Sequence, residues 1–68
     1  MTTVFFYSDL DDPQAWRATL QAALPDLKFV TGPECDQPEA VDVALVWTPP
    51  PQGFRAFTNL RAVLSLGA

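Results

Sequence analysis

Two short apolar runs in the second half of the chain constrain its fold more than any other feature. One covers residues 43–46 and ends in Trp-Thr-Pro-Pro-Pro at 47–51, and the other covers residues 62–66 and ends in Gly-Ala at 67–68. A continuous apolar run of this length, bounded by turn-forming residues, is typical of a strand buried on both faces. Such strands belong to parallel sheets that helices cover on both sides. The sequence therefore predicts a parallel sheet.

The first part of the chain predicts a strand followed by a helix. Residues 3–7, Thr-Val-Phe-Phe-Tyr, are β-branched and aromatic, which favours a buried strand. Asp11 and Asp12 then precede Pro13, and short acidic side chains cap helices whose first position suits proline. We expect a helix over residues 13–24, because Pro25 cannot continue it. One apolar stripe, which we expect to pack on the sheet, comprises Trp16, Leu20, Ala23 and Leu24.

The remaining segments connect these elements into one layered order. Residues 27–31 alternate apolar and polar side chains, which indicates an edge strand. Residues 34–40 form a loop, and its Cys35 is read as an incidental thiol because a nucleophilic cysteine needs a nearby base. Residues 52–57 fit one or two turns of helix. The connection from 47 to 61 is close to the minimum length of a right-handed parallel crossover.

The predicted fold class is α/β, a flavodoxin-like parallel sheet that is incomplete, with four strands and one main helix. A parallel sheet needs cover on both faces, yet the sequence offers only one long helix and one short one. We therefore expect a broad apolar face to remain in water, which soluble monomers avoid. The interpretation is that residues 1–68 are the N-terminal part of a larger domain.

Composition excludes several classes of function. Eight acidic against four basic residues give a net charge of −4, which argues against nucleic acid as a partner. A single cysteine excludes an internal disulfide and a multi-cysteine metal site. No apolar segment approaches the length that spans a bilayer, and the N-terminus lacks the basic start of a signal peptide. The expected location is cytoplasmic.

The carboxyl ends of the predicted strands are the place where a ligand is expected in an open α/β sheet. Ser8, Trp47 and Gly67 would line one rim there. Trp47 either forms an apolar wall over a ligand or packs beneath the next loop, and Gly67 either exposes backbone N–H groups to a small anion or simply turns the chain. The sequence contains no histidine and no Gly-rich phosphate loop, so we expect no catalytic residue in this chain.

Three stretches of the chain carry a resemblance to a known family. They are Val-Phe-Phe-Tyr-Ser-Asp-Leu-Asp-Asp-Pro-Gln-Ala-Trp at 4–16, Ala-Leu-Val-Trp-Thr-Pro-Pro at 44–50, and Asn-Leu-Arg-Ala-Val-Leu-Ser-Leu-Gly-Ala at 59–68. Together they resemble the N-terminus of the glyoxylate/hydroxypyruvate reductase A branch of the D-isomer-specific 2-hydroxyacid dehydrogenases. The resemblance covers nearly the whole chain and is weakest between 31 and 40.

The resemblance implies a two-domain, NADPH-dependent reductase that converts glyoxylate and hydroxypyruvate to glycolate and glycerate. This chain would begin its substrate domain, while the Rossmann domain that binds NADPH would lie beyond it. Gly67 and Ala68 match the start of the family's Gly-Ala-Gly-Val loop, whose amides hold the substrate carboxylate. Trp47 matches a tryptophan near the substrate, whereas Thr48 departs from the larger polar residues of the family. The family's catalytic arginine, glutamate and histidine would also lie beyond this chain, as would the segments that form its homodimer.

Two other readings remain open. One is a free-standing flavodoxin-like binding or receiver-type module, because Asp9, Asp11 and Asp12 follow the first strand as the acids of a receiver do. Against it, Trp47 stands at the end of the third strand, where a receiver carries its phosphoacceptor aspartate. The other is a non-catalytic remnant whose exposed face pairs with itself or with another chain.

Overall fold

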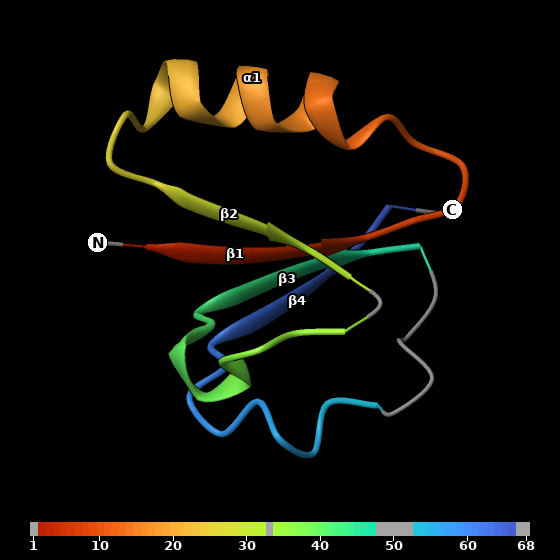
Figure 1. Ribbon diagram of the computed structural model, residues 1–68, viewed down its shortest axis with the longest axis vertical. Helices are drawn as coiled ribbons and strands as arrows, with labels where there is room; N and C mark the ends of the chain where they lie inside the picture. Colours follow the sequence, from red (N-terminus) through yellow and green to blue (C-terminus); the bar gives the residue numbers. More distant parts are fainter. Residues whose placement is uncertain (1, 33, 48–52, 67–68) are drawn as a thin grey trace.

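The described residues form an α/β unit built on one four-stranded parallel sheet. The computed structural model describes residues 2–32, 34–47 and 53–66. Its strands are β1 (Thr3–Tyr7), β2 (Lys28–Thr31), β3 (Val43–Val46) and β4 (Ala62–Ser65), and they lie in the order β2-β1-β3-β4 with every neighbouring pair parallel. The helix α1 (Pro13–Ala23) lies on one side of the sheet, and the described parts of the connections before β3 and before β4, residues 34–42 and 53–61, lie on the other (Figure 1).

The local signals placed several elements correctly. The strands expected at 3–7 and 43–46 are confirmed as β1 and β3. The helix begins at Pro13 as expected, and the Asp12 carboxylate accepts a hydrogen bond of 3.0 Å from the Gln14 amide. The helix ends at Ala23, one residue earlier than predicted, because Leu24 takes a non-helical conformation before Pro25.

A first core cluster fills the space between α1 and the sheet. Its buried members are Val4, Phe6, Leu27, Phe29 and Leu45. Trp16 and Leu20 pack against this cluster from the helix, and the rings of Trp16 and Phe6 lie 6.1 Å apart. The predicted core position of Trp16 is therefore confirmed. The C-terminal part of the stripe is wrong, since Ala23 is exposed and Leu24 is 53% exposed where the helix ends.

A second core cluster fills the opposite face without an α-helix. Its buried members are Phe5, Val41, Ala44, Val46 and Phe57, with Tyr7, Val30, Cys35, Phe54 and Leu60 packed around them. Tyr7 and Val30 belong to β1 and β2, whereas the cover over the sheet comes from the segment that includes Cys35 and the 3₁₀ helix η1 (Pro38–Ala40), and from the connection that precedes β4 and carries Phe54, Phe57 and Leu60. Irregular segments therefore bury a face that the sequence assigned to helices.

The turns of helix expected over residues 52–57 do not form in the described part of that stretch. Residues 53–61 make successive turns instead, with the Phe57 amide bonded to the Phe54 carbonyl at 3.0 Å and the Thr58 amide to the Ala56 carbonyl at 3.0 Å. Gly53 has a φ of +72°, which a right-handed helix cannot accommodate. The prolines at 49–51 and Gln52 lie outside the described residues.

Strand β4 departs most from the sequence-based expectation. A strand buried on both faces was expected, yet all four residues of β4 are exposed, with Val63 at 48% and Leu64 at 52%. The reason is that β4 is an edge strand and neither core cluster includes these two side chains. Among the described residues, the exposed large apolar side chains on the sheet itself are these two, while Leu10, Leu24 and Trp47 are exposed outside the strands, so no single broad apolar face is left in water. The Cα radius of gyration, 11.1 Å, is that of a compact unit, since a domain of this length averages about 11 Å.

Candidate functional site

The strand order creates one topological switch point, between β1 and β3. From β1 the chain crosses to β2 on one side, and from β2 it returns past β1 to β3 on the other side. Crossovers that leave in opposite directions open a crevice at the carboxyl ends of the two strands, and ligands of open α/β sheets bind in it. At this end of the sheet Tyr7 is the last residue of β1, Ser8 and Asp9 follow it, and Trp47 follows β3.

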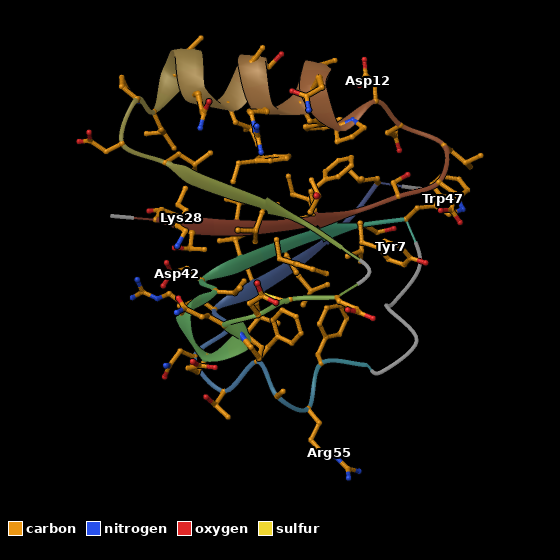
Figure 2. All side chains as sticks on the ribbon, viewed as in Figure 1. Tyr7, Asp12, Lys28, Asp42, Trp47 and Arg55 are labelled. Atoms are coloured by element: carbon orange, nitrogen blue, oxygen red, sulfur yellow. The ribbon has the colours of Figure 1, made fainter. Side chains whose placement is uncertain are left out.

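Trp47 stands on this rim, next to the end of β1. Its backbone amide donates a hydrogen bond of 3.0 Å to the Tyr7 carbonyl, so the two strands are paired up to their last residues. The Trp47 side chain is 42% exposed and belongs to neither core cluster. Figure 2 shows Tyr7 and Trp47 at one end of the sheet and Lys28 and Asp42 at the other. The Trp47 side chain is therefore accessible among the described residues, while the next loop, under which it was alternatively expected to pack, begins at residue 48 and lies outside them up to residue 52.

Ser8 also lies on the rim, but its hydroxyl holds the following turn together. The Ser8 Oγ accepts hydrogen bonds from the amides of Leu10 (3.1 Å) and Asp11 (3.2 Å) and donates one of 2.8 Å to the Asp11 carboxylate. Asp11 was expected to cap the helix, and this is wrong, because its side chain accepts from Ser8 while Asp12 makes the cap. Ser8 therefore positions the loop after β1, and its hydroxyl is engaged in hydrogen bonds within that loop.

A shallow depression of about 190 Å³ lies on the same rim, towards β2. Its lining comprises Phe6, Tyr7, Ser8, Asp9, Pro13, Thr31 and Gly32. Gly32 is sterically required there, since a Cβ at this position would come within 2.6 Å of the Phe5 ring and 3.1 Å of the Tyr7 Cβ. Trp47 does not line this depression, so the rim holds two separate features: a small hollow beside β2 and an exposed indole beside β3.

A larger cleft, of about 540 Å³, extends along β2 from Lys28 to Thr31 and was not predicted. It runs between β2 and the segment before β3, and its lining includes Arg17, Lys28, Glu34, Cys35 and Asp36. Cys35 is partly buried and packs against the second core cluster, which fits an incidental thiol. No sequence signal marks this cleft, because its walls come from segments whose contact depends on the tertiary fold.

The predicted carboxylate-binding pair cannot be placed, since Gly67 and Ala68 lie outside the described residues. Within the described ranges no group of three or more His, Cys, Asp or Glu side chains is arranged to hold a metal ion. No helix in the same ranges is long and apolar enough to cross a membrane. Comparisons of the chain with protein families, with curated proteins and with solved structures found no significant match.

Proposed function

We propose that this chain is the N-terminal part of the substrate domain of an NADPH-dependent reductase that acts on small 2-keto acids such as glyoxylate and hydroxypyruvate. The proposal starts from the sequence resemblance at 4–16, 44–50 and 59–68. The observation that carries it is the strand order, which puts Trp47 beside the carboxyl end of β1 at the switch point of a parallel sheet. That is the position from which a side chain lines a ligand crevice in a flavodoxin-like domain.

The apolar strip on β4 supports the same proposal. Val63 and Leu64 point to opposite faces of the sheet, since successive side chains of a strand alternate, and about half of each side chain is exposed. An edge strand that is apolar on both faces resembles an interior strand of a parallel sheet. In the proposed enzyme, later segments of the polypeptide cover both faces of β4 and complete the sheet in the flavodoxin-like order.

The chemistry assigned to this chain is limited to shaping the pocket. Trp47 offers an apolar wall and one indole N–H donor to the substrate. In the proposal, the backbone amides at Gly67 and Ala68 help to hold the substrate carboxylate. NADPH supplies the hydride for the 2-keto carbon, and we assign no cofactor-binding or catalytic residue to residues 1–68. By itself the chain is expected to be inactive.

The acidic residues after β1 limit where an anionic substrate could bind in the proposed enzyme. Asp9, Asp11 and Asp12 place negative charge beside the rim, and no basic residue occurs between 8 and 16. An anionic substrate is therefore repelled on the β1 side. In the proposed enzyme the positive charge that grips the carboxylate is supplied by a later segment, and the substrate lies towards β3 and β4.

The decisive test is to determine the coding sequence downstream of Ala68 and to assay the polypeptide that it encodes. A continuation Gly-Val-Asp, a later G-x-G-x-x-G stretch and glyoxylate-dependent oxidation of NADPH are the expected results. A short continuation with a lysine after a fifth strand would favour a receiver-type module instead. A stop codon after Ala68 would contradict the reductase and favour a non-catalytic remnant.

A substitution at the rim then tests the role of Trp47 in the full-length enzyme. We expect Trp47→Ala to raise the KM for glyoxylate about tenfold, as expected for the loss of about 1.4 kcal/mol of binding, with little change in the KM for NADPH. Leu24→Ala is the matched control, because Leu24 is also a large exposed apolar residue, 53% exposed, but lies at the C-terminal end of α1. An unchanged KM for glyoxylate in Trp47→Ala would remove this residue from the site.

A further inference from the structure

We draw no further inference here: the strongest candidate, the exposed apolar strip formed by Val63 and Leu64 on the edge strand β4, carries nothing more because nothing in the structure shows what covers it.

Discussion

The two edges of the sheet are both short strands, but they are protected to very different degrees. On β2, Phe29 is only 6% exposed, and the Arg17 guanidinium lies 5.4 Å from the centre of its ring. The same guanidinium donates a hydrogen bond of 3.4 Å to the Phe29 carbonyl. On β4, Val63 and Leu64 are each about half exposed, and the strand Ala-Val-Leu-Ser carries no charge and no proline.

This difference shows that the described residues protect the β2 edge of the sheet but leave the β4 edge exposed. Soluble proteins protect edge strands with charged side chains, with proline or with a covering segment. Strand β2 has such protection from α1, the helix that directly precedes it, and it also begins with the exposed Lys28. Strand β4 contains no charged residue and no proline, and its two large apolar side chains are about half exposed. The composition of β4 suits an interior position, whereas that of β2 suits the edge it occupies.

The largest expected difference between the edges is in the cost of truncating one apolar side chain on each. Phe29→Ala removes a buried ring that lies 5.6 Å from the ring of Phe6, and we expect it to lower the free energy of unfolding by about 3–5 kcal/mol. Leu64→Ala removes a side chain that is already half in water, and we expect a loss of about 1 kcal/mol or less. Urea titration of the purified protein, followed by circular dichroism, measures both.

A domain of this size has only about 3–5 kcal/mol of stability, so Phe29→Ala is expected to leave little folded protein. Phe29→Leu is the milder second variant that keeps the comparison measurable. A loss of about 2 kcal/mol or more from Leu64→Ala, as for a buried leucine, would mean that β4 is covered in solution, and the contrast between the edges would then disappear.

A smaller effect is expected at Gly32, the residue that follows β2. Gly32→Ala places a Cβ within 2.6 Å of the ring of Phe5, which is fully buried and cannot move aside freely. Overpacking of this kind costs about 1–3 kcal/mol. The control is Thr31→Ala, because Thr31 is exposed and we expect a change within about 0.5 kcal/mol. Thermal or urea denaturation distinguishes the two, and a neutral Gly32→Ala would show that the end of β2 is looser than the structure indicates.

The sequence was a sufficient guide to those elements of the fold that depend only on neighbouring residues. The cap by Asp12, the start at Pro13 and the buried strands β1 and β3 each follow from a few adjacent residues. The parallel arrangement also followed, because runs apolar on both faces suit such sheets. The rim residues Ser8 and Trp47 were placed by the rule that parallel strands end on the same side.

The features that the sequence did not predict have a common physical cause. Each of them depends on contacts between segments that are distant in the sequence. An apolar run shows what β4 prefers, but it does not show whether another segment reaches it. The turns at 53–61 bury Phe57 without a helix, because the ring of Phe57 packs 5.1 Å from that of Phe5 and 5.5 Å from that of Phe54. The cleft beside β2 depends on how residues 34–41 fold back, and no local pattern records that.

The contacts of Arg17 with Phe29 on β2 provide the next test. We expect Arg17→Ala to lower the free energy of unfolding by about 1 kcal/mol, since it removes one hydrogen bond and one cation–π contact at a partly exposed site. Arg55→Ala is the matched control, because Arg55 is exposed on the connection before β4 and points away from the sheet (Figure 2). If the two variants were equally stable, Arg17 would not protect the edge.

An effect of similar size is expected on self-association, and it tests the unprotected edge directly. A lysine in the middle of an edge strand opposes pairing with another strand, because its charge would have to leave water. We expect Leu64→Lys to weaken any concentration-dependent association of residues 1–68 about fivefold, which corresponds to about 1 kcal/mol for a half-exposed leucine that is no longer buried. Thr31→Lys on β2, the edge that α1 protects, is expected to leave association unchanged. Sedimentation velocity over a range of protein concentrations measures both variants against the parent chain. Equal weakening by the two lysines would mean that net charge, and not the apolar strip on β4, controls association, and the two edges would then be equivalent in solution.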